Sequence, residues 1–246
     1  MENFNKELEK LREKERKLEK MRQDFVSSAS HELKTPIAII RGYAEGLKIN
    51  VDEEDTAMQE YCDIIMNEAD KMNTLVLSLL EASLYSSGMK ALNKEEFQLN
   101  EFIKEYMKAA KPIFEEKEIN AKFIDSETPL MVFADKSQIE RVLSNYISNA
   151  CSHTKNEKEI IVSVEASGEK YKVSVYNSGS FIDDKDKENI FNSFYRADKA
   201  HSRKEGRFGL GLSIVKSIMD MHKCECGFTN KENGVEFWFE IEKAKG

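Results

Sequence analysis

The stretch FVSSASHELKTPIAII, residues 25–40, decides how the N-terminal third of the chain folds. At about 100° per residue in an α-helix, its apolar residues fall into one stripe that continues to residue 47. The members of this stripe are Phe25, Ala29, Leu33, Pro36, Ile40, Tyr43 and Leu47. His31 points almost the opposite way, so the spacing predicts an amphipathic helix with a histidine on its solvent side.

The residues around His31 favour a chemical role for it. Packing gives a histidine no reason to stand on a wet helix face, although a structural histidine is the more common case. Glu32 can accept a hydrogen bond from one ring nitrogen and leave the other as a nucleophile. Thr35 follows one helical turn later on a neighbouring part of the surface. Pro36 has no N–H, so the helix is expected to bend there.

A second amphipathic helix is predicted after the polar loop NVDEEDT. Its apolar stripe consists of Met58, Cys62, Ile65, Ala69, Met72, Val76 and Leu79. Two such helices form an antiparallel hairpin, and a second copy would complete a four-helix bundle that buries both stripes, so a homodimer is expected. Residues 1–23 carry a thin seven-residue apolar repeat, which favours a parallel coiled coil over a single solvated helix.

Composition excludes several classes of protein. The 246 residues suffice for two domains, and 33% charged residues with 40% hydrophobic residues are typical of a soluble globular protein. A net charge of -8 argues against nucleic-acid binding. No apolar run reaches the roughly 18 to 20 residues that span a bilayer. The four cysteines lack zinc-ligand or redox spacing and are expected to be free thiols in a reducing cytoplasm.

The hydrophobic period changes after YSSGMKALN. Six alternating runs predict strands: NAKFID, LMVFAD, EIIVSVEA, KYKVSVYN, CECGFTN and VEFWFEIE. They interleave with helical stretches, which predicts an α/β domain with a mixed or antiparallel sheet. The predicted division is therefore residues 1–23 as a signalling helix, 24–88 as the helical domain and 89–246 as the α/β domain.

Two groups of polar residues and glycines in this domain suit a phosphate ligand. Asp135 and Gln138 form a capping box at the start of a helix on which Asn145 and Asn149 lie one turn apart. Oxygen-bearing side chains at this spacing suit Mg²⁺, although they could simply form the wet side of the helix. Asn177 is expected at a strand end. Farther on, EGRFGLGLSIV places glycines at a helix N-terminus, where backbone amides bind anions, but it matches neither a dinucleotide fingerprint nor a P-loop.

Taken together, these motifs resemble the kinase core of the sensor histidine kinases of two-component signalling. SHELKTP is similar to the phosphoacceptor box, NYISNACSHT to the N box, YNSGS to the first glycine box, IFNSFYRAD to the phenylalanine box and GRFGLGLSIV to the second glycine box. The resemblance covers essentially the whole chain. It implies a dimerisation and phosphotransfer hairpin followed by an α/β-sandwich ATPase domain of the gyrase, chaperone and histidine-kinase type.

The resemblance also implies site residues. His31 would accept the γ-phosphoryl group of ATP, Glu32 would assist it, and Thr35 would position water for dephosphorylating a response regulator. The implied ATP-binding residues are Asn145, Asn149, Asn177, Gly179, Phe191, Phe194, Arg196, Arg207, Gly209 and Gly211, with Asn149 also the ligand of Mg²⁺. A lid is expected over residues 198–208, which are polar.

Three positions depart from the family pattern. Asn177 stands where an aspartate usually accepts from the adenine amino group, and its amide oxygen can still accept. Ser152 stands where a phosphate-contacting lysine is usual, and Lys155 or Arg207 are the candidate replacements. Phe181 stands at the usual second glycine of the first glycine box.

The function expected from this resemblance is that of an ATP- and Mg²⁺-dependent protein-histidine kinase. It would pass the phosphoryl group to an aspartate of a response-regulator receiver domain and dephosphorylate that regulator. The alternative is a non-catalytic or phosphatase-dominant dimeric scaffold. A membrane sensor is expected upstream, with this region as the cytoplasmic portion.

Overall fold

The computed structural model describes residue 29 and residues 33–47, 55–86, 91–126, 128–196 and 208–244. The chain forms two compact units, one of Met1–Leu80 with Ala200–Phe208 and the other of Glu81–Lys199 with Gly209–Gly246. They are called the N-terminal and the C-terminal unit. The coiled coil predicted for residues 1–23 lies outside the described residues. The domain boundaries predicted after residues 23 and 88 stay predictions.

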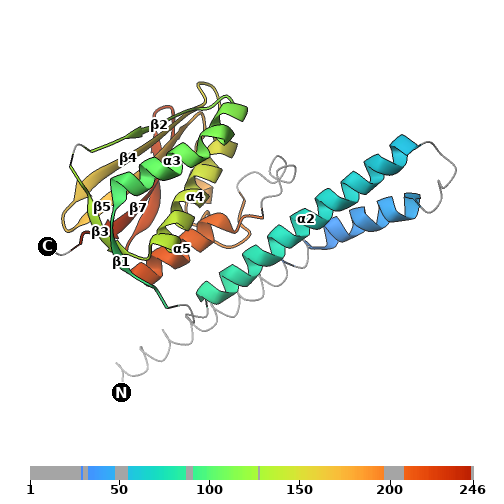
Figure 1. The fold of residues 1–246 in the computed structure, drawn as a ribbon, viewed down its shortest axis with the longest axis horizontal. Coiled ribbons are helices and arrows are strands. Elements are labelled where there is room, and N and C mark those ends of the chain that lie inside the picture. Colours follow the sequence, from blue (N-terminus) through green and yellow to red (C-terminus); the bar gives the residue numbers. More distant parts are fainter. Residues whose placement is uncertain are drawn as a thin grey trace, which may run out of the picture. The chain divides into compact units, whose positions relative to one another are not determined.

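The N-terminal unit is an antiparallel pair of helices (Figure 1). The first helix covers residues 33–47, with residue 29 also helical, and α2 runs from Asp55–Ser86. Every described member of the first predicted stripe is buried or half-buried, so that stripe is confirmed. The rings of Tyr43 and Tyr61 pack edge to face with centroids 5.3 Å apart. Gly46 lies against the same Tyr61 ring, where an added Cβ would come within 3.0 Å of it.

The stripe predicted for α2 is only partly correct within one chain. Ile65 and Met72 are half-buried as expected, but Met58 and Val76 are 42% and 41% exposed. The position that is fully buried is Leu75. A single partner helix covers one narrow line of α2, and this line lies beside the predicted one. The remaining apolar side is left exposed in the single chain.

The C-terminal unit is a layer of helices on a five-stranded sheet. Its strands are β1 Glu95–Gln98, β2 Asn120–Ile124, β3 Met131–Ala134, β4 Glu159–Ser167, β5 Lys170–Ser178, β6 Cys226–Lys231 and β7 Gly234–Glu242, and its helices are α3 Leu99–Glu116, α4 Lys136–His153 and α5 Gly211–His222, with a 3₁₀ turn at Asp184–Asp186. The sheet order is β2-β4-β5-β7-β6, and only β2 and β4 are parallel. Figure 1 shows α3, α4 and α5 on one face of this sheet. The predicted α/β sandwich with a mixed sheet is therefore confirmed.

The short strand β1 was not predicted from the sequence. It pairs antiparallel with β3 in a separate two-stranded sheet. Its sequence, EEFQ, contains a single apolar residue, Phe97, and therefore has no alternation to read. The other six strands were predicted. The described cysteines are all free thiols, as expected.

The core forms because alternate residues of the central strands face the helices. Val162 on β4, Val175 on β5 and Phe237 on β7 are all nearly inaccessible to solvent. Tyr146 of α4 is fully buried against the Phe237 ring, with centroids 5.5 Å apart. Its hydroxyl donates to the carbonyl oxygen of Trp238 at 3.1 Å, which satisfies the one polar atom that this ring buries.

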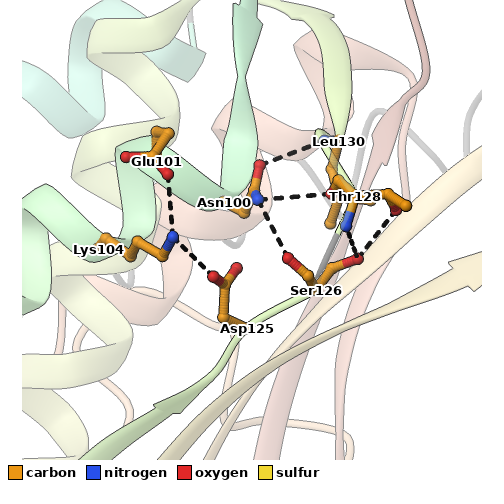
Figure 2. A network of polar contacts seen from close by, with 7 residues as sticks. All are labelled: Asn100, Glu101, Lys104, Asp125, Ser126, Thr128 and Leu130. Atoms are coloured by element: carbon orange, nitrogen blue, oxygen red, sulfur yellow. Dashed lines mark hydrogen bonds and ion pairs between the residues drawn. The ribbon is translucent and has the colours of Figure 1, made fainter.

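A polar network fastens the loop between β2 and β3 to the start of α3 (Figure 2). The Oδ1 atom of Asn100 accepts from the backbone N–H of Leu130 at 3.2 Å, and its Nδ2 atom donates to the carbonyl of Ser126 at 3.5 Å. Lys104, one turn farther along α3, pairs with Asp125 at 2.7 Å. Asn100 is 3% exposed, so this loop is anchored by a buried amide rather than by surface charges alone.

The start of α4 is joined to the end of α5 by a buried histidine. The Asp135 carboxylate accepts from the N–H of Gln138 at 3.2 Å, so the predicted N-cap is confirmed. Gln138 does not complete the capping box. Instead the Asp135 N–H donates to Nε2 of His222 at 3.2 Å, and Nδ1 of His222 lies 2.9 Å from the carbonyl oxygen of Ile218. His222 must be neutral to accept the Asp135 bond.

This joint predicts that the domain loses stability in mild acid. Burial lowers the pKa of His222, so the unfolded chain takes up this proton first, near its usual pKa of about 6.5. The stabilisation is fully present above that pH and is lost as the pH falls below it. We expect a lower melting temperature at pH 5.5 than at pH 7.5, and a smaller difference in His222→Gln, whose amide oxygen can still accept from Asp135.

Asp135 itself acts in a different window of pH. Burial raises its pKa, but hydrogen bonds from Ser137 and from the N–H groups of Asn93 and Gln138 outweigh this and lower it. Its contribution is therefore lost only as the pH falls below about 4.

An equal pH dependence of melting in His222→Gln and the wild type between pH 7.5 and 5.5 would contradict the assignment to His222.

Candidate functional site

Thr35 is the only one of the three proposed phosphotransfer residues that the structure describes. His31 and Glu32 lie outside the described residues. Thr35 is exposed on the first helix, whereas Pro36 is buried. Lys34 and Ala38, which follow His31 by three and seven residues, are also exposed. The side of the helix on which the sequence spacing puts His31 is thus solvent-facing in its described part.

The two amides on α4 differ in their surroundings. Asn145 is half-buried, and its Nδ2 atom donates to the carbonyl oxygen of Arg141 at 2.9 Å, which orients its Oδ1 atom. Asn149 lies one turn later and is also half-buried. Its side chain has no hydrogen-bond partner within the part of the chain that the structure describes. An amide that nothing else engages can coordinate a cation through its oxygen.

Two glycines, one just before α5 and one at its first residue, lie very close to neighbouring groups. A Cβ on Gly211 would lie 2.7 Å from Oδ1 of Asn145, so α5 begins directly beside that amide. Gly209 has φ of +70°, which favours glycine, and a Cβ there would lie 2.8 Å from the carbonyl oxygen of Tyr195. Gly209 therefore requires glycine for its backbone conformation as well as for space, whereas at Gly211 a side chain would displace the Asn145 amide.

The N-terminus of α5 offers unpaired backbone donors. The N-cap residue Leu210 has no polar side chain to cap it. The first backbone bond of the helix runs from the N–H of Ile214 to the carbonyl oxygen of Leu210 at 3.0 Å. The N–H groups of residues 211–213 have no backbone acceptor among the described residues. Together with the helix dipole, these groups can bind an anion such as a phosphate.

The loop of the phenylalanine box packs against Gly209. The Phe194 N–H donates to the Gly209 carbonyl oxygen at 2.9 Å. Phe194 has φ of +64°, which is rare for an aromatic residue. Phe191 and Arg196 are half-buried in the same loop, while Arg207 lies outside the described residues, as does the predicted lid except for its last residue.

Asn177 is the next-to-last residue of β5 and is fully buried. Its Nδ2 atom donates to Oγ of Ser180 at 2.6 Å. Its Oδ1 atom is buried without a partner within the described residues. An unpaired buried acceptor costs about 1–3 kcal/mol, so a ligand that donates a hydrogen bond here would remove this penalty. The exocyclic amino group of adenine is a donor of the required kind.

α4 connects the two halves of the candidate site. Its middle, at Asn145, meets the start of α5. After its last turn, the N–H of Lys155 donates to the carbonyl oxygen of Ser178 at 3.0 Å, and the hydroxyl of Ser178 donates back to the Lys155 carbonyl at 3.0 Å. Gly179, with φ of +73°, packs so closely on the Lys155 backbone that a Cβ would lie 2.7 Å from it. The end of β5 is thereby held against the C-terminal end of α4.

The three departures from the family pattern can now be located. Ser152 is half-buried, and its hydroxyl has no partner among the described residues. A serine hydroxyl is neutral, so it does not replace the positive charge of the usual lysine. Lys155 is exposed and adjoins Gly179, whereas Arg207 is outside the described residues. Phe181 is 68% exposed and does not have a positive φ. The left-handed residue of this turn is Gly179, so phenylalanine at position 181 does not disturb the turn.

Sequence reasoning missed two polar contacts in this region. Ser180 binds the Asn177 amide, and the hydroxyl of Tyr195 donates to Oδ1 of Asp186 at 2.6 Å. Tyr195 stands between Phe194 and Arg196, which the resemblance singled out. Its partner Asp186 lies nine residues earlier, a spacing that matches neither helix nor strand periodicity, so the sequence did not predict this contact. For the contact between Ser180 and Asn177, the sequence offers one signal: Ser180 follows Asn177 by three residues, with the turn residue Gly179 between them.

No cluster of three or more His, Cys, Asp or Glu side chains able to hold a metal occurs in the described residues. A divalent cation here would therefore depend on the α4 amides together with ligand oxygens, which is how Mg²⁺ commonly binds beside nucleotides. Within the described ranges, none of the helices has the length and apolar character to cross a membrane.

Two family profiles match the chain. Residues 21–88 match the His Kinase A (phospho-acceptor) domain, and residues 134–245 match the histidine kinase-, DNA gyrase B-, and HSP90-like ATPase. The sensor protein VanSB of Enterococcus faecalis is 33% identical over 230 residues, which are 93% of this chain and 51% of that protein. The chain thus spans about half the length of this curated relative.

Solved structures agree with these matches. Histidine kinase ThkA, in its complex with the response regulator protein TrrA, is 34% identical with a TM-score of 0.73, covering 90% of this chain and 61% of that one. The catalytic domain of ThkA alone is 35% identical with a TM-score of 0.54, covering 61% of this chain and 96% of that one.

Proposed function

The chain belongs to the sensor histidine kinases of two-component signalling, and on this premise we propose that it uses ATP to phosphorylate His31 and then transfers the phosphoryl group to an aspartate of a response regulator. The observation that carries the proposal is the buried Oδ1 atom of Asn177 at the end of β5, which has no partner among the described residues. The end of β5 adjoins the C-terminal end of α4, and Asn145 farther along α4 lies against the N-terminus of α5. A purine base and a phosphate chain need these two kinds of group.

The residues divide the work of binding ATP between them. Oδ1 of Asn177 accepts from the adenine amino group, and Gly179 gives the turn beside it. The backbone amides at the start of α5 bind phosphate oxygens, and Gly209 and Gly211 leave space for the phosphates to approach. Asn149, with Asn145 beside it, holds Mg²⁺, which supplies neutralisation of the triphosphate charge when bound. Phe191, Phe194, Arg196 and Arg207 belong to the segment that would cover the nucleotide.

His31 supplies the acceptor for the phosphoryl group. Glu32 accepts the N–H of one ring nitrogen, so the other nitrogen is unprotonated and attacks the γ-phosphorus. The new bond joins nitrogen to phosphorus, and the bond from the γ-phosphorus to the bridging oxygen breaks, which releases ADP. Catalysis rests on positioning and charge stabilisation rather than on a strong base.

The proposed partners are a second copy of the chain and a receiver domain. Met58, Met66, Val76 and Leu77 of α2 are all at least 41% exposed in the single chain, and a second hairpin would cover an apolar helix side of this kind. The receiver domain follows from the phosphorelay chemistry, and the related ThkA was solved with a response regulator. A membrane sensor upstream and a cytoplasmic location for this region complete the proposal.

Incubation with γ-labelled ATP and Mg²⁺ tests the kinase function. We expect label on the protein that is stable in alkali and labile in acid, as a phosphohistidine is. A folded protein that binds ATP but takes up no label would contradict the kinase and favour the scaffold. Loss of phosphate from a labelled receiver without any autophosphorylation would favour the phosphatase-dominant alternative.

Thr35→Ala is expected to separate the two activities. The hydroxyl of Thr35 is exposed one turn after His31, where it can orient water towards a phosphoaspartate without touching ATP. Autophosphorylation should stay close to wild type, while dephosphorylation of the receiver with ADP and Mg²⁺ should slow by about a hundredfold, the lower end of the range for loss of one positioned catalytic group. Alanine is the better helix former, so folding should survive.

A matched control is Thr74→Ala on α2, where the exposed hydroxyl donates to the carbonyl oxygen of Asp70 in its own helix. This variant should keep both activities. If Thr35 only adapts the helix to Pro36, both activities of Thr35→Ala should change together or not at all. An unchanged rate of receiver dephosphorylation would reject the proposed role of Thr35.

A further inference from the structure

A buried carboxylate fixes the hydroxyl of Tyr195. Asp186 is 5% exposed, and its Oδ1 atom accepts from the Tyr195 hydroxyl at 2.6 Å. The backbone of Asp186 is also held, because its carbonyl oxygen accepts from the N–H groups of Asn189 and Ile190 at 3.0 and 3.1 Å. Asp186 is therefore a rigid anchor. A short hydrogen bond to an ionised acceptor is among the stronger ones in proteins.

The backbone of Tyr195 contacts Gly209, two residues before the start of α5. Its carbonyl oxygen lies 2.8 Å from the point where a Cβ of Gly209 would stand. The preceding residue, Phe194, has the rare φ of +64° and donates its N–H to the Gly209 carbonyl oxygen at 2.9 Å. A bulky residue holds such a conformation only where its surroundings impose it. The Tyr195 hydroxyl bond, at the next residue along the chain, is one side-chain contact that helps to do so.

The contacts continue from Gly209 to the proposed phosphate site. Gly209 is two residues before Gly211, where α5 begins and where Oδ1 of Asn145 makes the closest contact. A shift of the Tyr195 backbone would move Gly209 and with it the amides of residues 211–213. The end of β5 with Asn177 is not in this chain of contacts, since it is held by Lys155 and Ser180.

From this chain of contacts we propose that Tyr195 is a positioning residue for phosphate binding, acting through its bond to Asp186 and its packing on Gly209. The inference rests on the proposed function and adds a division within it: Tyr195 governs the phosphate half of the site, and the base half is independent of it. A purely structural hydroxyl would instead stabilise the domain and affect every ligand equally.

Tyr195→Phe tests this, because it removes one oxygen and keeps the ring. Dissociation constants for ATP and ADP are measured by calorimetry, and that of adenosine by an NMR titration that reaches millimolar affinities. We expect ATP and ADP to bind about threefold to tenfold more weakly, the range for loss of one hydrogen bond, with adenosine unchanged. The matched control is Tyr171→Phe on β5, whose hydroxyl has no hydrogen-bond partner within the described residues and whose loss should leave all three ligands unaffected.

Variants of Asp186 complete the test. Asp186→Asn keeps an acceptor oxygen and should retain more ADP affinity than Asp186→Ala. Combining Asp186→Ala with Tyr195→Phe should add little to either single change, because both remove the same bond. Equal weakening of adenosine and ATP in Tyr195→Phe, or additive losses in the double variant, would overturn the proposal. A wild-type protein that binds none of the three ligands would refute the proposed function itself, and the positioning role with it.

Discussion

His31→Gln is expected to reduce incorporation of label from γ-labelled ATP to background, while the melting temperature stays near that of the wild type. Glutamine is similar in size and polar, but its amide nitrogen is not a nucleophile, so no phosphoramidate can form. Helical spacing puts this side chain on the same side as Lys34, Thr35 and Ala38, all of which are exposed. A substitution on this solvent-facing side of the helix should remove little packing, so stability should change by less than about 0.5 kcal/mol.

The control for this variant is its nucleotide binding. Apart from Arg207, the groups proposed to bind ATP lie in the C-terminal unit, so His31→Gln should bind ATP with wild-type affinity and fail only in transfer. Label at the wild-type level in His31→Gln would remove His31 from the mechanism and direct the search to another acceptor. A large fall in melting temperature would instead support the structural interpretation of this histidine.

Asn149→Asp is expected to lower autophosphorylation by about a hundredfold, because a metal ion supplies several kcal/mol of charge stabilisation in phosphoryl transfer and each 1.4 kcal/mol is about tenfold in rate. The substitution keeps an oxygen that can bind Mg²⁺, but it adds a negative charge beside the triphosphate and removes the amide donor. Asn149 has no hydrogen-bond partner in the described part of the chain, so the folded domain should tolerate the change.

Asn120→Asp provides the matched control for Asn149→Asp. Asn120 is exposed at the start of β2, at the opposite end of the sheet order from β6, and carries the same change of amide to carboxylate. It should label like the wild type. Asn149→Asp should also need more Mg²⁺ for half-maximal labelling. Near-normal labelling at all Mg²⁺ concentrations would contradict the role of Asn149 as a metal ligand.

The sequence predicted the parts of the fold that depend on local period. The stripe through Leu33, Pro36 and Tyr43 is buried or half-buried, the cap of α4 forms at Asp135, and Asn177 lies at the end of a strand. Each of these follows from residues within a few positions of one another, where helix and strand geometry leaves few choices.

What the sequence did not predict depends on which distant residue becomes the partner. Gln138 had the right spacing to complete the capping box, yet His222 takes that bond from 87 positions away. The buried line of α2 passes through Leu75 because one helix of a hairpin covers only part of an apolar side. Periodicity indicates that a face is apolar, but the direction of approach of its partner is set by the tertiary fold.

The candidate site shows the same division. The residues proposed to contact phosphate and base could be named from the sequence, because glycines beside a helix start and amides one turn apart are local patterns. The hydrogen bonds that hold these residues in place could not be predicted from the sequence. The bond between Asp186 and Tyr195 and the bond between Asn177 and Ser180 each depend on a turn of specific shape. A turn is determined by the backbone angles of one or two residues, such as Gly179, and single residues leave no pattern.

The hydrogen bond between Phe194 and Gly209 has a consequence for how this family can vary in length. It joins the two ends of the segment between these residues, so residues inserted into that segment leave the bond in place. Closing a loop costs entropy only with the logarithm of its length, and a doubling adds about 0.6 kcal/mol. Insertions and deletions should therefore accumulate between residues 196 and 209 over evolution far more readily than at Gly209 or Gly211.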